Sequence, residues 1–258
     1  MPTKPQTRKF GWKPDVPDHR DLEYAKVAVN IPAKLPSSVD LRAKCSAVED
    51  QQTLGSCTAN ALVGNLEFLL LKNKKPFVDL SRLFVYYNER VLEHSVPLDN
   101  GACLRDGIKT LAKEGCCTEK LLGYDISQFA KKPSTACYAE AKTRVITQYA
   151  RLNTLLDMKT CLAAGYPFVF GFTVYSNFMT AKVAKTGRGD MPGPRDTVQG
   201  GHAVCAVGYS DASSRFIIRN SWGPKWGLDG YFTLPYEYVA SGGRMSDDFW
   251  TIRAGTNL

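Results

Sequence analysis

Apolar residues recur at helical spacing through much of the first half of the chain. In three segments, 57–72, 81–91 and 104–111, they repeat every three or four positions, which is the pattern of amphipathic helices. Ser56 and Ser81 stand where N-capping side chains are expected for the first two segments. The pattern therefore predicts three helices before about residue 115.

After about residue 144 the pattern becomes that of strands, with runs of β-branched and aromatic residues. Four such runs are present: 166–174, 202–207, 215–219 and 230–234. One short helix is expected over 157–164, and the stretch 182–199, rich in Gly, Pro and charge, is expected to be a mobile loop. A helical first part and a β-rich second part favour an α+β protein of two lobes with a cleft between them.

Residues 1–35 differ from the rest of the chain. They show neither helical nor alternating periodicity, and their proline density favours an extended segment without a core of its own. Phe10, Trp12 and Val16 are apolar residues that could hold such a segment against a surface. We interpret residues 1–35 as an N-terminal extension.

Length and composition are those of a globular protein. The chain has 258 residues, of which 44% are hydrophobic and 22% charged, enough for one large domain or two modest lobes. No apolar stretch approaches the roughly 20 residues of a membrane-spanning helix. The first residues contain no apolar core of a secretory signal. The protein is therefore expected to stay inside the cell or to leave by a route without that signal, unless a signal is missing from the sequence.

Net charge and cysteine spacing bear on two other kinds of function, the binding of nucleic acid and the binding of a metal ion. The net charge is +8, but the basic residues are scattered and not interleaved with aromatic residues, which favours a solvated basic face over nucleic-acid binding. Binding of nucleic acid or another polyanion remains an alternative. The eight cysteines contain no C-x-x-C pair, so no zinc site is expected, nor any other metal or cofactor. One or two disulfides remain open.

Three residues could together perform nucleophilic catalysis. Cys57 begins a predicted helix, whose positive end favours a thiolate. His202 follows two glycines at the start of an apolar strand, and Asn220 ends the next strand, where its amide could fix the tautomer of the imidazole. Each residue alone has a structural explanation: a buried cysteine, a structural histidine, an asparagine that bonds a turn. Their order and local settings together favour a Cys-His-Asn site.

The surroundings of these residues resemble the motifs of the papain family of cysteine peptidases, and within it a bacterial branch. The resemblance covers about residues 36–250 and is carried by four stretches: Leu35–Arg42, Gln51–Ala59, Gly201–Val204 and Asn220–Gly227. It implies the papain-like two-lobe fold. A helical N-terminal lobe (about 36–143) and a β-barrel-like C-terminal lobe (about 144–258) would face each other across the active-site cleft.

The resemblance also implies roles for individual residues. Cys57 would attack a peptide carbonyl as a thiolate and form a thioacyl-enzyme, with His202 as its base. The side chain of Gln51 and the backbone N–H of Cys57 would form the oxyanion hole. Four further residues would contact substrate or shield the site: Gly101, Ala102, Gly201 and Trp222. Asp247 and Asp248 lie in the region of the chain from which the second substrate pocket could be built.

The sequence departs from the family pattern in three ways. Thr58 replaces the usual tryptophan after the nucleophile and is expected to reshape the cleft. Leu54 replaces a usual cysteine, so a disulfide common in the family cannot form. Only the short extension precedes the domain in place of a long helical pro-region.

The expected activity is hydrolysis of peptides or proteins, in a zymogen whose extension runs through or beside the cleft and blocks it until it is moved or cut. Alternatives remain for each part. The extension could be a disordered or surface-docked tail, and the domain could be an inactive binding protein or an enzyme that transfers the acyl group to an amine.

Overall fold

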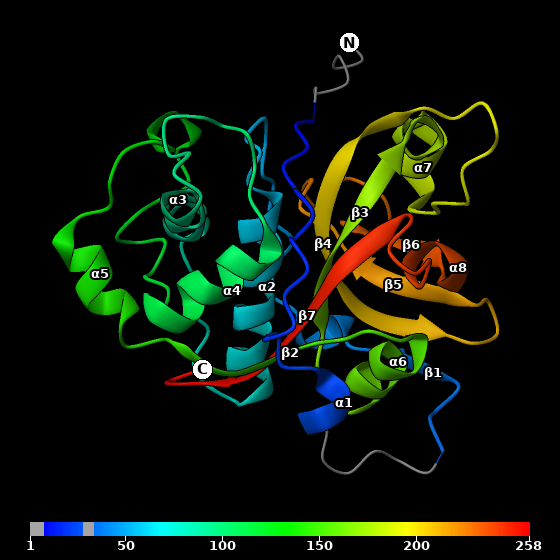
Figure 1. Ribbon diagram of the computed structural model, residues 1–258, viewed down its shortest axis with the longest axis horizontal. Coiled ribbons are helices and arrows are strands. Elements are labelled where there is room, and N and C mark those ends of the chain that lie inside the picture. Colours follow the sequence, from blue (N-terminus) through cyan, green and yellow to red (C-terminus); the bar gives the residue numbers. More distant parts are fainter. Residues whose placement is uncertain (1–7, 28–33) are drawn as a thin grey trace.

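The helices α2 to α5 and the sheet occupy separate halves of the molecule. The structure, a computed structural model, describes residues 8–27 and 34–258. In Figure 1 the helices α2 to α5 lie on the left and the sheet lies on the right. One hydrophobic core runs from α2 into the central strands, because α2 packs against β4. Within the described residues, no helix is both long enough and apolar enough to cross a membrane.

The three predicted helices are present, together with a fourth. Their bounds are Cys57–Lys72 (α2), Arg82–Leu92 (α3), Leu104–Lys113 (α4) and Thr135–Ala141 (α5). Ser81 caps α3 as expected, since its side chain accepts a hydrogen bond from the backbone N–H of Phe84. The capping role expected of Ser56 is wrong: its hydroxyl bonds the hydroxyl of Tyr124, 2.6 Å away, and caps no backbone group of α2.

The β half is one open antiparallel sheet. Its strand order is β2-β7-β3-β4-β5-β6, and β1 pairs with β4 outside this path. The sheet does not close into a barrel. The strands are Ser38–Asp40 (β1), Ile146–Arg151 (β2), Phe168–Tyr175 (β3), Val198–Ser210 (β4), Arg215–Arg219 (β5), Tyr231–Pro235 (β6) and Ser246–Gly255 (β7). The pattern predicted β3 to β6 but missed β1, β2 and β7, in which polar and charged residues interrupt the apolar ones.

Short helices connect these strands. They are Leu155–Ala163 (α6), Ala181–Thr186 (α7) and Tyr236–Val239 (α8). The expectation of one loop over 182–199 is wrong at both ends. Thr180 caps α7, Gly187 ends it in a left-handed conformation at φ 60°, and β4 already begins at Val198.

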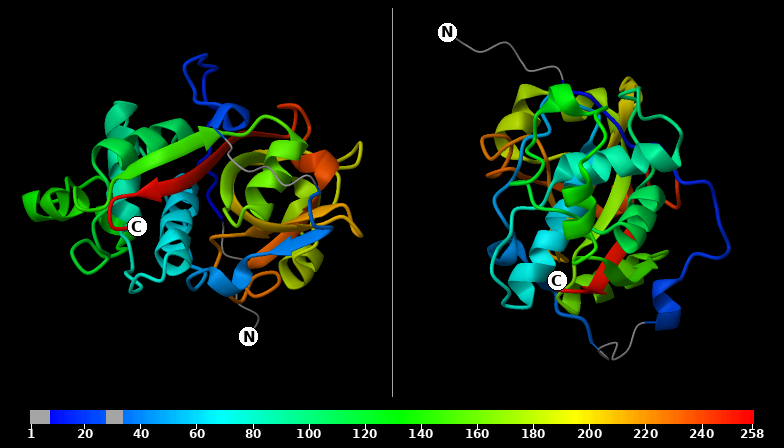
Figure 2. Two further views of the ribbon diagram at one scale, coloured as in Figure 1. Left: turned by 90° about the horizontal axis from the view of Figure 1, so that it is seen from below. Right: turned by 90° about the vertical axis from the view of Figure 1, so that its left-hand side faces the viewer.

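The N-terminal segment, defined here as residues 8–27, runs between the two halves. In Figure 1 its blue trace passes between the helices and the sheet and ends in α1 (Tyr24–Val27). The side view in Figure 2 shows the segment along one edge of the molecule down to α1. It pairs with the helical half through a bridge between Trp12 and Ala102, and with β2 through a bridge between Glu23 and Arg151. The segment is therefore held by both halves.

Candidate active site

Strand β4 and the end of β5 bring His202 and Asn220 together, and the thiol of Cys57, at the start of α2, lies against the backbone of Ala203, the residue after His202. Nε2 of His202 lies 2.8 Å from Oδ1 of Asn220, which also accepts the backbone N–H of Ser221 at 2.9 Å. Because Oδ1 can only accept, Nε2 of a neutral His202 ring carries the proton and Nδ1 is free to act as a base. Nδ1 is buried and has no hydrogen-bond partner among the described residues.

Aromatic rings enclose the imidazole. Trp222 stacks on His202 with ring centroids 4.8 Å apart and planes 24° apart. Phe10 of the N-terminal segment approaches both rings, at 6.2 Å from His202 and 6.3 Å from Trp222. The side chain of His202 is therefore shielded from water on several sides, and it is fully buried.

Burial determines the charge state of the site in this arrangement. It raises the pKa of the Cys57 thiol to about 12 and lowers the pKa of His202 to about 4. Both groups are therefore neutral near pH 7. The expected thiolate is not favoured here, because the cost of burying a charge exceeds the attraction of the helix start. The backbone that covers the thiol includes Gly11. Its hydrogen bond to the thiol lowers the pKa of Cys57, but by less than burial raises it.

Gln51 presents an oriented donor beside Cys57. Its Oε1 accepts the hydroxyl of Ser221 at 2.7 Å, which fixes the amide so that Nε2 is the outward group. Nε2 donates to the carbonyl oxygens of Leu54 at 2.9 Å and of Lys9 at 3.1 Å. The carbonyl of the N-terminal segment thus occupies the donor that the sequence assigned to an oxyanion.

Gly101, Ala102 and Gly201, predicted to bind substrate, lie along the backbone of the N-terminal segment. The N–H of Ala102 donates to the carbonyl of Gly11 at 2.7 Å, and its carbonyl accepts from Lys13 at 3.1 Å. Ala102 thus forms one wall beside the segment, in the helical half. On the opposite wall, in β4, the carbonyl of Gly201 accepts a hydrogen bond from the N–H of Trp12 at 2.9 Å. Both walls bind an extended peptide backbone, and here that backbone is the segment itself.

Close approach to Gly55 requires glycine at position 11. A Cβ added to Gly11 would lie 1.8 Å from the carbonyl oxygen of Gly55, two residues before Cys57. A Cβ on Gly101 would lie 1.9 Å from the carbonyl oxygen of Gly11. The segment and the cleft fit together only because neither position carries a side chain.

Ion pairs fix the segment before Gly11, and hydrogen bonds to a buried carboxylate fix it after Gly11. Arg8 pairs with Asp50 at 2.5 Å and Lys9 with Asp99 at 2.6 Å. These pairs are partly exposed, so each contributes little stability alone. Further along, the buried carboxylate of Asp15 accepts the indole N–H of Trp250 at 3.1 Å and the backbone N–H of Arg105 at 3.0 Å.

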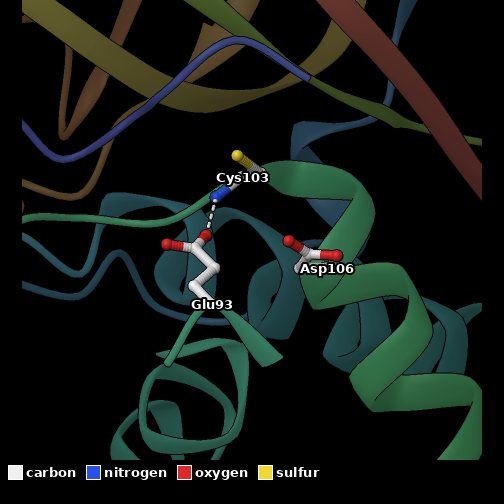
Figure 3. Close-up of side chains that lie close together, drawn as sticks. All are labelled: Glu93, Cys103 and Asp106. Carbon is white, nitrogen blue, oxygen red and sulfur yellow. Dashed lines mark hydrogen bonds between the residues drawn. The ribbon is translucent and has the colours of Figure 1, made fainter. Parts of the chain in front are cut away.

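Within the described residues, one group of three side chains, Glu93, Cys103 and Asp106, is close enough to share a metal ion. Figure 3 shows Glu93 bonded to the backbone of Cys103, with Asp106 on the neighbouring helix. Oε1 of Glu93 accepts that N–H at 2.7 Å, and Oε2 pairs with Lys13 of the N-terminal segment. Both oxygens of Glu93 are therefore already bonded, one to the loop before α4 and one to the N-terminal segment. Glu93 thus holds the segment against this loop.

Several functional contacts were not foreseen from the sequence. Ser221 lies next to Asn220 but gave no signal of its own. Thr58 is buried, and its hydroxyl donates to Glu89 on α3 at 2.8 Å. The side chain of Thr58 is thus engaged within the helical half, and the expected effect of this replacement on the shape of the cleft stays a prediction. All eight cysteines, which lie among the described residues, are free thiols.

A family model described as papain family cysteine protease matches residues 35–247. The chain therefore belongs to the papain family of cysteine proteases and is a hydrolase with the papain-like fold.

Two relatives resemble the chain over nearly its whole length. Xylellain, a cysteine protease from Xylella fastidiosa, has a crystal structure that is 42% identical in sequence, covers 98% of this chain and 99% of its own, and superposes with a TM-score of 0.87. An uncharacterized peptidase C1-like protein of Acanthamoeba polyphaga mimivirus is also 42% identical, over 100% of this chain and 90% of its own length. A cathepsin B-like protein of Giardia intestinalis is 29% identical over 77% of this chain and 69% of its own.

Proposed function

We propose that Cys57, His202, Asn220 and Gln51 hydrolyse peptide bonds through a thioacyl-enzyme, and that the N-terminal segment holds the enzyme latent. The observation that carries the proposal is the position of the segment. Its backbone pairs with Ala102 and Gly201 on opposite walls, while the carbonyl of Lys9 takes the side-chain donor of Gln51.

Release of the segment would activate the nucleophile. Water would reach the site and remove most of the burial cost that keeps Cys57 and His202 neutral. The start of α2 would then favour a thiolate, with the proton held on Nδ1 of His202 and Nε2 still bonded to Asn220.

Hydrolysis then follows in two steps. The thiolate of Cys57 attacks the peptide carbonyl carbon, and the negative oxygen accepts hydrogen bonds from Nε2 of Gln51 and the backbone N–H of Cys57. The C–N bond breaks, the leaving amine takes the proton from His202, and a thioester remains. Water, deprotonated by His202, attacks this thioester, which releases the acid and restores the thiol. Losing one oxyanion donor typically costs about 3 kcal/mol of transition-state stabilisation.

Latency follows from occupancy and burial together. The segment places backbone over Cys57, blocks the Gln51 donor and covers the ring of His202 with Phe10. A substrate cannot bind the same walls while the segment is present. The substrates proposed are peptides or proteins with an extended stretch of backbone, since the walls bind backbone groups.

The test compares full-length protein with protein lacking residues 1–34, on dipeptidyl fluorogenic substrates under reducing conditions. Both carry matched Cys57→Ala controls. We expect higher activity without the segment and none in either Cys57→Ala protein. Equal activity with and without the segment, in folded protein, would refute latency. No hydrolysis in any form would favour a binding protein, and aminolysis products formed with an added amine would indicate acyl transfer.

A further inference from the structure

Trp12 fills a pocket of the cleft that is built for a large flat side chain. The residue is only 9% exposed. Its indole lies over Gly171 of β3 and Gly201 of β4, where an added Cβ would come within 1.9 Å and 2.8 Å of ring atoms. The two glycines therefore create the space that the indole fills.

The pocket contains a buried acceptor, Asp248 of β7. Its side chain is fully buried, and its Oδ2 accepts the indole N–H of Trp12 at 3.0 Å and the backbone N–H of Asp15 at 2.8 Å. Both donors belong to the N-terminal segment. When the segment leaves, Oδ2 loses these two donors, and a substrate side chain that buries it again leaves a costly unsatisfied acceptor unless that side chain donates a hydrogen bond. A substrate side chain that donates a hydrogen bond would restore the lost contact.

The charge of Asp248 is already balanced from the other side. Oδ1 accepts from the guanidinium of Arg151 at 2.9 Å, and the same guanidinium pairs with Asp247 at 3.0 Å. It also faces Asp15 at 3.4 Å and Asp21 at 3.5 Å, which depart with the segment.

After the segment is released, Arg151 keeps its ion pairs with Asp247 and Asp248 and loses those with the two carboxylates of the segment. Arg105, which pairs with Asp21 at 2.5 Å, loses that partner too. A cationic substrate side chain entering the pocket would therefore approach the guanidinium of Arg151, which then has fewer counter-charges than before. A neutral donor meets no such repulsion.

We propose that Asp248 selects substrates whose side chain in the Trp12 pocket is a neutral aromatic donor, tryptophan or tyrosine, in preference to phenylalanine, arginine or lysine. This inference rests on the proposed peptidase function. It identifies the substrate class from the contacts that the segment's own tryptophan makes.

The test uses the full-length protein with Gly11→Ala, which displaces the segment. Peptide substrates differ at one residue, at each of the two positions before the cleaved bond in turn. The matched pairs are tryptophan against 2-naphthylalanine and tyrosine against phenylalanine. The first member of each pair carries a side-chain hydrogen-bond donor that the second lacks. Arginine is the cationic probe. At the position that enters the pocket, we expect kcat/KM about tenfold higher for each donor-bearing member, and lower for arginine than for tryptophan.

Asp248→Asn should abolish the preference. Arg151 holds the oxygen side of the new amide, so the amide N–H₂ would face the pocket and oppose the substrate donor. Asparagine also tolerates the left-handed backbone at this position, φ 59°. Asp247→Asn is the matched control, because Asp247 also bonds Arg151 but is half-exposed and makes no hydrogen bond to Trp12. Equal rates within each pair, faster cleavage with arginine, or an unchanged preference in Asp248→Asn would each overturn the inference.

A second measurement separates this inference from the peptidase proposal. In full-length protein, the rate at which iodoacetamide alkylates Cys57, followed by mass spectrometry of its peptide, reports opening of the segment. We expect Trp12→Tyr to stay slow and Trp12→Phe to react about tenfold faster. In the Asp248→Asn background the two should react equally. If no peptide is cleaved but this pattern holds, the hydrolysis proposal fails and the pocket assignment stands; equal rates for Trp12→Tyr and Trp12→Phe with Asp248 intact overturn the pocket assignment.

Discussion

Replacing Gly11 by alanine tests whether the segment closes the active site. The added Cβ would lie 1.8 Å from the carbonyl oxygen of Gly55 and 2.5 Å from its carbonyl carbon. Ordinary contact begins at 3.4 Å, so the first distance is short by 1.6 Å. The neighbour is backbone of the loop that carries Cys57, and no side-chain rotation relieves the clash.

The size of the effect follows from this overlap. Forcing one extra carbon into a packed site typically costs about 1–3 kcal/mol, and each 1.4 kcal/mol changes an equilibrium tenfold. The open fraction of the full-length enzyme should therefore rise about 5- to 150-fold. Gly11 does not have a positive φ, so alanine leaves the free segment unstrained and the penalty falls on the docked state.

The assay is hydrolysis of a fluorogenic peptide by full-length protein, with circular dichroism as a check on folding. Gly123→Ala is the matched control, because the nearest atom to its added Cβ is 3.8 Å away. We expect Gly11→Ala to approach the activity of protein lacking residues 1–34, and Gly123→Ala to behave as the parent. A folded Gly11→Ala protein no more active than the parent would show that the segment does not limit access.

Three further predictions concern groups around the cleft. Ser221→Ala removes the hydroxyl that orients the Gln51 amide. In protein lacking the segment, kcat should therefore fall about tenfold with KM little changed. Ser221→Thr should retain activity, and a change in KM alone would contradict this role. Burial and the nearby Asp248 carboxylate raise the pKa of Asp15 from 3.8 to about 6. The docked segment therefore binds a proton more readily than the free one, and docking should weaken up to about a hundredfold as pH rises from about 4 to 6. The activity ratio of full-length to truncated protein should rise over this range, and not in Asp15→Asn. Arg151→Met leaves the fully buried carboxylates of Asp15 and Asp248 without their shared cation, so stability should fall by about 3–5 kcal/mol, measured as a lower midpoint of thermal unfolding; an unchanged midpoint would mean that these carboxyls are held protonated.

Local features of the sequence were sufficient for the parts of the fold that depend on nearby residues. The helices α2 to α4 followed from apolar spacing, because one face or the whole of each is buried. The strands β3 to β6 followed from their apolar and β-branched runs. In contrast, β7 carries Asp247, Asp248 and Arg253. The burial of Asp248 is stabilised by an ion pair with the distant Arg151, so no local pattern revealed this strand.

The sequence by itself determined the family and the residues that could perform the chemistry, because motif residues lie within a few positions of one another at the start of α2, near the start of β4 and at the end of β5. Only the tertiary structure decided how those residues are held. Burial raises the pKa of the Cys57 thiol, and the backbone packed against that thiol includes Gly11, 46 positions earlier in the chain. The pairing of Trp12 with Asp248 joins residues 236 positions apart, and such contacts arise only when the folded halves bring the N-terminal segment and β7 together.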